Sequence, residues 1–531
     1  MTSRNALLLV IGVSAALRLA AAASLGPFQN EAYYFLYARH LDWSYFDHPP
    51  MVGLVSALGL KVAGWASPIL GLRIGFVALF AGSTWLMARL TSRAFGAWAG
   101  VLAALALNCT TFYGLKVGTL SEPDGPLLFF WLLTLDRLMV AVEDPDRAWP
   151  WVGAGAALGA AMLSKYYAIL LPAGFMLYLV ARPSARRCLR ARGPYVATAV
   201  SLALFAPVIV WNAAHGWASF AFQSKRSGGF QGFQPAMLME ALVAQVFFLT
   251  PWILAWLVLV AYRLARRGPR AWSDAEAFLI CQAAPALTLF LGIATYRRIM
   301  PHWPMIGFIA LIPMLGRVWA EALAARPTRF RRRLAIITLI PIVVGFLFVA
   351  QSRTGLLQDG RGRLLGLVSP AEDPTVDPMR WSQIAAELGR RGLLDDPKSF
   401  LFTDSWRYSA DLAMATGGDA PVACFHRDAR SFTAWSRPED WVGRDGIYVQ
   451  ADADLVSAHV FAPWFARIEP LPPITIVRAG VPIQQVQLYR CVRQTDPYQF
   501  GYKGPGPIPR PLHAAQEVRV ASPTSPSRTL R

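Results

Sequence analysis

Uninterrupted apolar runs of about 20 residues, long enough to cross a bilayer core as helices, recur along the first two thirds of this chain. A helix in lipid satisfies its own backbone hydrogen bonds. The runs therefore predict an all-α polytopic membrane bundle of about 11 transmembrane helices. The expected spans are residues 6–25, 68–88, 97–115, 126–142, 151–164, 167–181, 194–213, 239–262, 275–294, 303–320 and 334–351.

The composition favours a membrane protein over a soluble one. Hydrophobic residues make up 55% of the 531 residues and charged residues only 16%, whereas soluble domains carry roughly 25% charged residues. In a soluble protein the net charge of +19 would suggest a nucleic-acid partner. Here the basic residues gather in short loops between apolar runs, as topology signals do, and no nucleic-acid-binding motif is present.

Three arginine-rich loops set the expected orientation. Residues 182–192 and 325–333 hold five arginines each, and residues 262–270 hold four. Because such loops stay in the cytoplasm, the alternate loops and everything after residue 351 are expected outside it. The sequence thus predicts a multi-pass protein of the bacterial inner (cytoplasmic) membrane, with the run 6–25 retained as its first helix.

The chain changes character after the last expected span. Short β-like runs alternate with helical patterns, so a membrane domain (1–351) is expected to be followed by an extracytoplasmic α/β domain (352–495). Residues 496–531 are rich in Pro, Gly and Ser and predict a disordered tail. Cys424 and Cys491 both fall in the α/β domain, where a disulfide and two free thiols are equally compatible with the sequence. The expected strands are residues 399–403, 421–425, 446–450, 474–478 and 484–490.

Acidic residues gather in two of the outward-facing loops, NEAYYFLYARHLDWSYFDHPP and KVGTLSEPDGP. The acids of interest and the histidine beside them are Glu31, Asp47, His48, Glu122 and Asp124. Such a set can hold a divalent cation or take a proton from an attacking hydroxyl; alternatively, these are solvated residues that cap helices. We favour function for Glu31 and Asp124, since acids that face a bundle cavity tend to be functional, while Asp47 and His48 are explained as well by a turn.

A few basic residues go against the topology rule. On the outward side these are Arg39, Lys116, Lys165, Lys225, Arg226, Arg297 and Arg298. Lys165 lies at a helix break in LSKYY, and Arg297 and Arg298 lie with His302 in YRRIMPHWP, at a depth where a lipid phosphate would accept charge-assisted hydrogen bonds. The alternative is snorkelling to headgroups. Rings that could stack on a sugar, although aromatic belts mark every membrane interface, include Tyr34 and Tyr166.

Several of these blocks together resemble a known family. In order along residues 30–304 the chain reads NEAYYFLYARHLDWSYFDHPPM, SEPDGPLLFFW, LSKYYAILLP, PVIVWNAAHGWASFAFQ and HWP. They resemble the bacterial GT-C-type integral membrane glycosyltransferases related to protein O-mannosyltransferases and to the lipid A aminoarabinose transferase. The segment FTAWSRPEDW…GIYV within residues 432–449 also looks like the C-terminal domain of that family.

The resemblance implies a glycosyltransferase (hexosyl- or pentosyltransferase) that uses a polyprenyl-phosphate sugar donor. It would pass the sugar to a lipid, glycan or protein acceptor outside the cytoplasm. The family's D-E-A-Y-Y pattern falls here on N-E-A-Y-Y, so that Asn30 replaces the leading acid. Glu31 would then take over the acid's work, or that work would shift to Asp47 or Asp124.

The resemblance also implies where the carrier binds. The family's T-P-D-A-P pattern keeps its acid, which falls on Asp124 and follows Glu122 closely. Lys165 and the region before His302 fall where the family contacts the carrier phosphate. A divalent cation is compatible with the acids, although no cofactor is demanded by the sequence.

Two other functions fit the same groups: a transporter or flippase for a polyprenyl-linked sugar, and a non-catalytic binder of it. Alternating access generally uses a site near the midplane between inverted repeats, and neither is visible in the sequence. No P-loop, GxGxxG, HExxH or GxSxG motif is present, so a nucleotide-driven mechanism has no visible site. No residue pattern distinguishes mannose, glucose, aminoarabinose or galacturonic acid as the sugar.

Overall fold

The computed structural model describes residues 1–28, 30–227, 229–230, 232–451 and 457–498. It divides into two compact units. One, the helical unit, comprises Met1–Ser24 and Leu41–Phe346; the other, the C-terminal unit, comprises Leu25–His40 and Leu347–Arg531. Most of the predicted tail 496–531, from residue 499 onward, lies outside the described residues.

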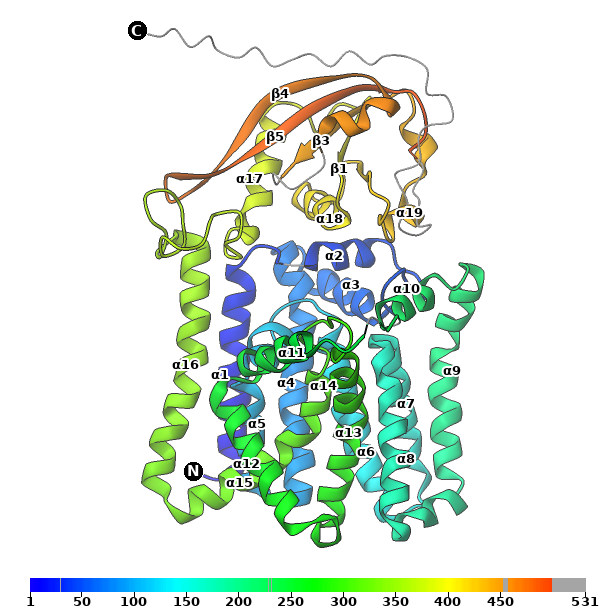
Figure 1. Ribbon diagram of the computed structural model, residues 1–531, viewed down its shortest axis with the longest axis vertical. Helices are drawn as coiled ribbons and strands as arrows, with labels where there is room; N and C mark the ends of the chain where they lie inside the picture. The colour runs from blue at the N-terminus through cyan, green and yellow to red at the C-terminus, as the bar shows by residue number, and fades with distance from the viewer. Residues whose placement is uncertain (29, 228, 231, 452–456, 499–531) are drawn as a thin grey trace. The chain divides into compact units, whose positions relative to one another are not determined.

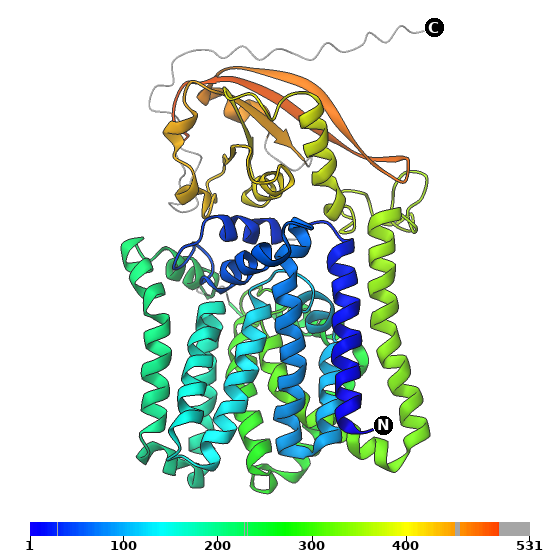
Figure 2. The ribbon, with the colours of Figure 1, turned by 180° about the vertical axis from the view of Figure 1, so that it is seen from behind.

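Long helices that run side by side dominate the helical unit (Figure 1). Its helices are α1 (Ser3–Ser24), α3 (Met51–Ala63), α4 (Pro68–Phe95), α5 (Ala97–Asn108), α6 (Asp124–Glu143), α7 (Ala148–Ser164), α8 (Leu170–Ala181), α9 (Gly193–Ala214), α10 (Ala218–Ser227), α11 (Pro235–Leu249), α12 (Pro251–Arg267), α13 (Asp274–Ala294), α14 (Met305–Phe308), α15 (Ile312–Ala325) and the larger part of α16 (Pro327–Thr354). The view from behind shows the same bundle (Figure 2).

Among the described residues, 7 helices are long and apolar enough to cross a membrane, or up to 10 if each bent pair counts as one span. The chain is therefore a multi-pass membrane protein. The mainly helical fold is confirmed, whereas the expected count of about eleven spans is not. The expected span 151–164 corresponds to α7, which has 17 residues, the lower end of the range for a transmembrane helix.

Capping residues and small side chains explain how these helices begin and pack. Ser273 and Glu276 form a reciprocal capping box that starts α13, which satisfies backbone N–H groups that the helix itself cannot pair. In α7, a Cβ added at Gly155 would come within 2.4 Å of the Ala197 carbonyl oxygen of α9. Only a glycine allows this close approach of two helices, as is common in membrane bundles.

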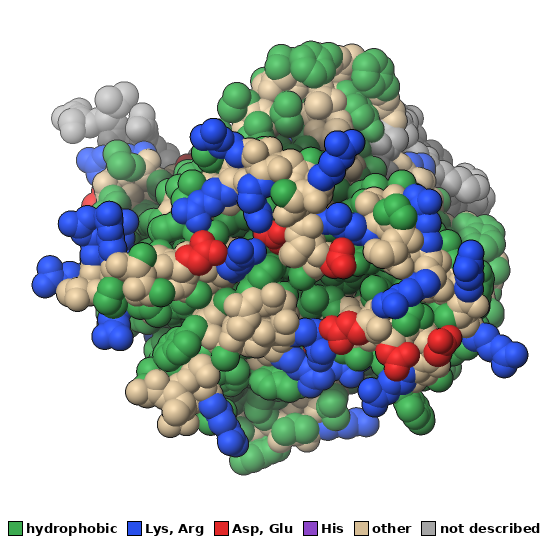
Figure 3. All heavy atoms as spheres, turned by 90° about the horizontal axis from the view of Figure 1, so that it is seen from below, with side chains coloured by type: hydrophobic (Ala, Val, Ile, Leu, Met, Phe, Trp, Pro, Cys, Tyr) green, Lys and Arg blue, Asp and Glu red, His purple; other side chains and the backbone are tan. Residues whose placement is uncertain are grey.

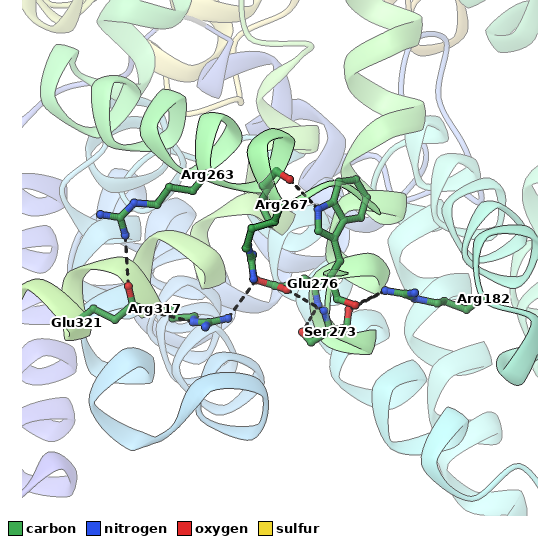
Figure 4. A network of polar contacts seen from close by, with 9 residues as sticks. Arg182, Arg263, Arg267, Ser273, Glu276, Arg317 and Glu321 are labelled. Atoms are coloured by element: carbon green, nitrogen blue, oxygen red, sulfur yellow. Dashed lines mark hydrogen bonds and ion pairs between the residues drawn. The ribbon is translucent and has the colours of Figure 1, made fainter. Parts of the chain in front are cut away.

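Basic side chains gather at the end of the helical unit that holds the arginine-rich loops, where Lys and Arg outnumber Asp and Glu (Figure 3). Glu276, at the start of α13, binds two of these arginines, Arg267 at 2.5 Å and Arg317 at 3.1 Å (Figure 4). Arg317 also pairs with Glu321 at 3.0 Å. Because these partners come from α12, α13 and α15, the network ties three helices together at this end.

The C-terminal unit is built around one mixed sheet, in the order β2-β1-β3-β5-β4. β1 is parallel to β2 and β3, and β5 is antiparallel to β3 and β4. Its elements are α2 (Glu31–Arg39), α17 (Asp377–Arg390), β1 (Ser399–Thr403), α18 (Trp406–Ala415), β2 (Val422–Cys424), α19 (Phe432–Trp435), β3 (Asp445–Gln450), β4 (Phe465–Arg478) and β5 (Val481–Gln494). The predicted C-terminal sheet domain is confirmed.

Both faces of the central strands are buried. Leu401 packs in one apolar cluster, and Phe400 and Phe402 pack in another on the opposite face. This explains why β1 reads as a continuous apolar run, as strands covered on both faces do. Cys424 and Cys491 are both free; they lie on β2 and β5, which β1 and β3 separate in the sheet. Three strand spacings amount to about 14 Å, beyond the reach of a disulfide, so this pairing is excluded.

Candidate active site

A buried ion pair lies at the centre of the site in the helical unit. The ammonium of Lys165 donates to both carboxylate oxygens of Asp124, each at 2.9 Å, and the two side chains are only 8% and 15% exposed. Asp124 is the first residue of α6, where the helix dipole favours a negative charge. Lys165 lies in extended backbone between α7 and the short 3-10 helix Tyr166–Ile169. The helix break predicted from LSKYY thus places this lysine beside the acid.

Two aromatic rings and an arginine surround this pair. The Lys165 ammonium lies 5.3 Å from the centre of the Tyr167 ring, and that ring packs edge-on against Trp303. The guanidinium of Arg226, near the end of α10, lies 5.4 Å from the Trp303 ring. Cations over ring faces are attracted by the ring quadrupole. The rings therefore hold two cations from distant parts of the chain in one place.

Two histidines complete what we call the charged cluster, which consists of His48, Asp124, Lys165, Arg226 and His302. Burial is the main cause that lowers the pKa of His48 to about 4, and Lys165 and Arg226 lower it further. Burial also lowers the pKa of His302 well below its usual value, with Lys165 contributing in the same direction. Asp124 acts on both histidines in the opposite sense. Both rings are thus neutral at neutral pH, and the positive charge of the cluster comes from Lys165 and Arg226.

Three other predicted site residues of the helical unit, Asp47, Glu122 and Tyr166, each make contacts of a different kind. Asp47 is buried, and its carbonyl oxygen accepts a hydrogen bond from Gln223 at 2.7 Å. Glu122 is buried and lies 3.5 Å from the ammonium of Lys116. The ring of Tyr166 packs against Phe205 and Phe220.

Arg298, a predicted phosphate ligand, is found in an exposed setting. Its guanidinium pairs with Glu240 at 2.9 Å, and its side chain is 73% exposed. Its neighbour Arg297 is partly buried. Arg226 instead contacts Trp303 and acts on both histidines. The sequence placed Arg226 among the outward basic residues, but nothing in its spacing singled it out.

Glu31 and Tyr34 belong to the C-terminal unit, because α2 packs in that unit against α18. Glu31 is fully buried, and its carboxylate accepts a hydrogen bond from the Phe28 N–H at 3.0 Å. The Tyr34 ring is buried and packs edge-on against Tyr37. Nothing in the sequence indicates that residues 25–40 belong to the same unit as the residues beyond 346, more than 300 residues away.

Tyr33 fixes α2 to the C-terminal unit. Its hydroxyl donates to the Ser431 Oγ at 2.9 Å and accepts from the Ser431 N–H at 3.1 Å. Its ring lies 4.9 Å from the Trp406 ring and 5.6 Å from the Trp435 ring. Since these contacts involve the third residue of α2, they also fix the backbone that carries Glu31.

A second acid, which sequence reasoning missed, lies near Glu31. Asp411 on α18 is 5% exposed. Burial raises the pKa of Asp411 to about 8, with Asp377 and Glu31 adding to the increase and Arg407 and Arg380 opposing it. Asp411 is therefore mostly protonated at neutral pH and can donate a hydrogen bond.

No group of three or more His, Cys, Asp or Glu side chains that could hold a metal ion is found within the described residues. The divalent cation considered from the sequence thus gains no such ligand set there. The described geometry brings together two cations, two neutral imidazoles and one carboxylate, and that carboxylate accepts hydrogen bonds from Lys165.

Known proteins resemble this chain in sequence and in fold. The family model described as dolichyl-phosphate-mannose-protein mannosyltransferase matches residues 47–211, less than a third of the chain. The lipid A galacturonosyltransferase RgtD of Rhizobium johnstonii is 22% identical over 303 residues, which cover 53% of this chain and 58% of that protein. The matched region thus spans little more than half the length of that relative.

Solved structures extend the likeness to nearly the whole chain. The crystal structure of ArnT from Cupriavidus metallidurans in the apo state has a TM-score of 0.60 at 17% identity, and covers 91% of this chain and 97% of ArnT. The structure of the same protein bound to undecaprenyl phosphate has a TM-score of 0.56 at 16% identity, with 91% and 98% covered.

The resemblance to GT-C-type membrane glycosyltransferases is confirmed. At this level of identity the solved structures establish a shared fold, with a helical membrane part followed by a C-terminal sheet domain. The family match begins at Asp47 and includes Asp124 and Lys165, whereas Arg226 and His302 lie beyond it.

Proposed function

We propose that this chain is a membrane glycosyltransferase that moves a sugar from a polyprenyl-phosphate carrier to a lipid, glycan or protein acceptor outside the cytoplasm. The observation that carries the proposal is the charged cluster. Five side chains from five separate segments meet in the helical unit, and the two cations among them lie beside aromatic rings. Intramembrane charges are costly and usually mark a functional site.

The cluster suits a lipid-borne phosphate. Lys165 and Arg226 would bind the phosphate oxygens through charge-assisted hydrogen bonds, with Lys165 turning from Asp124 toward the ligand. As the acceptor oxygen attacks the anomeric carbon, the bond from that carbon to the phosphate oxygen breaks, and negative charge develops on the departing carrier phosphate. Cations already in place stabilise this charge without reorganisation, which lowers the barrier.

The acceptor proton requires a base, and we assign that role to Glu31. A positioned base typically contributes roughly 100- to 10,000-fold. Asp47 and Asp124 are the alternatives; the ion pair with Lys165 makes Asp124 the weaker candidate, because its carboxylate is already occupied. The galacturonosyltransferase and undecaprenyl-phosphate-bound relatives support a sugar–lipid reaction of this class.

The basic end of the helical unit supports the orientation that we propose. The arginine-rich loops gather there (Figure 3), and positively charged loops remain in the cytoplasm. We therefore place that end in the cytoplasm of a bacterial inner membrane. The segment after α16, which contains the α/β domain, is placed on the outer side.

The test is transfer by the purified full-length protein in proteoliposomes. We would supply an undecaprenyl-phosphate-linked sugar together with a lipid A acceptor and detect sugar-extended acceptor by mass spectrometry. Arg226→Gln should reduce transfer strongly. Arg298→Gln is the matched control, because it removes an exposed arginine that is paired with Glu240, and it should transfer like the unmodified protein.

The outcomes separate the candidate functions. A covalently extended acceptor supports the transferase. Movement of the carrier across the bilayer with no new glycosidic bond would support the flippase instead, and binding of the carrier with neither result would support the non-catalytic binder. Equal loss of transfer in both arginine variants would remove Arg226 from its proposed role.

A further inference from the structure

A short segment of the C-terminal unit presents leucines to its surroundings. Residues 355–368, which we call the leucine loop, begin directly after α16 and precede the α/β sheet. Leu356 is 62% exposed, Leu365 62% and Leu367 83%. Single exposed leucines are ordinary on protein surfaces, but three on one 14-residue loop require a reason.

The leucine loop is ordered by hydrogen bonds and is not an extended linker. The Asp359 carboxylate accepts hydrogen bonds from the backbone N–H groups of Arg361 at 2.9 Å and Arg363 at 2.8 Å. The side chain of Gln358 donates to the carbonyl of Arg478, the last residue of β4, at 3.0 Å. The loop therefore holds its leucines in fixed positions on the C-terminal unit.

Backbone strain accompanies the exposure of one leucine. Leu365 has φ of +51°, a left-handed conformation that costs energy for any residue with a Cβ. Its N–H nevertheless donates to the Leu357 carbonyl at 2.7 Å, so the conformation is fixed. A residue held in strained backbone with its apolar side chain exposed is a reason to look for a binding function.

The position of the loop in the chain favours the membrane as its binding partner. α16 is long and apolar enough to span a membrane and ends at Thr354, and its last turns belong to the C-terminal unit together with the loop. The Gln351 side chain accepts from the Leu357 N–H at 2.5 Å, which ties the loop to the end of that helix. The apolar run of α16 ends at Ala350, so the loop begins about one helical turn beyond it.

The positive charge in and beside the leucine loop also favours the membrane as its binding partner. Three arginines, Arg353, Arg361 and Arg363, are exposed in or beside the loop. Leucines combined with arginines fit the interface of a membrane that contains anionic lipids. We propose that the leucine loop is a lipid-binding element: its leucines enter the acyl-chain boundary, and its arginines bind lipid phosphates. This inference does not depend on the transferase activity.

The test measures the depth of a fluorophore on the loop in full-length protein reconstituted in lipid nanodiscs. All five native cysteines are buried, so an environment-sensitive probe such as NBD can be attached selectively to Leu367→Cys. The matched control is Ala466→Cys, an exposed position near the start of β4. It lies about 40 Å along that strand from Arg478, at 3.3 Å per residue.

With phospholipids that carry a nitroxide near the headgroup, the label at position 367 should lose most of its fluorescence, and the label at position 466 should keep it. In Leu367→Cys, adding Arg361→Gln and Arg363→Gln should abolish the extra quenching that anionic lipids cause. Equal quenching at both labelled positions would overturn the proposal. So would self-quenching between labelled copies in place of quenching by lipid, because the leucines would then bind a second copy.

Discussion

The ion pair between Asp124 and Lys165 can be tested by substituting each residue in turn. We expect the two substitutions to change the affinity for the carrier in opposite directions. Asp124 and Lys165 form an ion pair, so the carboxylate competes with any phosphate for the same ammonium. We expect Asp124→Asn to tighten binding of undecaprenyl phosphate and Lys165→Met to weaken it. If the pair only holds helices together, both substitutions should act in the same direction.

The geometry sets the size of the effect. At 2.9 Å and an effective dielectric constant of about 20, the gross attraction is roughly 6 kcal/mol, most of which offsets desolvation. The net value of a charge-assisted hydrogen bond is about 1.5–3 kcal/mol, which corresponds to roughly 10- to 100-fold in a dissociation constant. Asp124→Asn should therefore lower the Kd by up to this factor, and Lys165→Met should raise it by a similar factor.

The assay is titration of purified protein with undecaprenyl phosphate by microscale thermophoresis, with the Tm of each variant measured alongside. Asp136→Asn is the matched control: Asp136 is a fully buried carboxylate of the helical unit that pairs with Arg89 at 3.2 Å. It should leave the Kd unchanged. Weaker binding in both Asp124→Asn and Lys165→Met, or tighter binding in Asp136→Asn, would refute the reasoning.

Four further results are expected. Glu31→Gln should lower transfer by roughly 100- to 10,000-fold without changing the Kd for undecaprenyl phosphate; unchanged transfer would remove Glu31 as the base. Asn30→Asp should not accelerate transfer, since a second carboxylate beside Glu31 disfavours ionisation of both; a faster enzyme would return the role to position 30. Tyr33→Phe should cost about 1–3 kcal/mol in unfolding free energy, because it leaves the buried Ser431 N–H without its acceptor, as denaturant titration would show. The pKa of Asp411 is raised in the folded state to about 8, so its contribution to stability is present below about pH 4 and is lost as the pH rises through about 8; in pH-dependent Tm measurements Asp411→Asn should lack this slope.

Much of the fold could be predicted because its signals are local. Apolar runs identify membrane helices, since lipid leaves a backbone no other partner, and SFLFT coincides with β1 at residues 399–403. The predicted count of about eleven spans is not confirmed, because the chain contains bent helix pairs and short helices. α11 and α12, expected as one span over 239–262, meet at a bend of 110°, where Thr250 adopts φ of +72°. Hydropathy averages over such a bend and cannot detect it.

Residues of the site could be predicted only where a charged side chain lies at an interruption of an apolar run. Lys165 was found because a lysine in an apolar run needs a partner, and LSKYY interrupts that run. The sequence presents Arg226 and Lys225 as parts of an ordinary polar loop, whereas in the structure Arg226 lies near the end of α10 and packs against Trp303. Arg298 looked equally suitable in the sequence, yet it pairs with Glu240 at the surface. Pairing preferences among distant charges are set by tertiary packing and leave no periodic signal.

The replacement of the family's leading acid by Asn30 is easier to understand once α2 is known to begin at Glu31. A carboxylate in the first turn of a helix is stabilised by the helix dipole, and the Phe28 N–H donates to it. Glu31 therefore places a carboxyl group at the same helix terminus, one residue later and on a longer side chain. Nearby, burial raises the pKa of Asp411, so one acid of this pair holds its proton at neutral pH. Because a protonated acid donates a hydrogen bond and cannot take up a further proton, Asp411 does not suit the role of base, and Glu31 remains the carboxylate to which we assign that role.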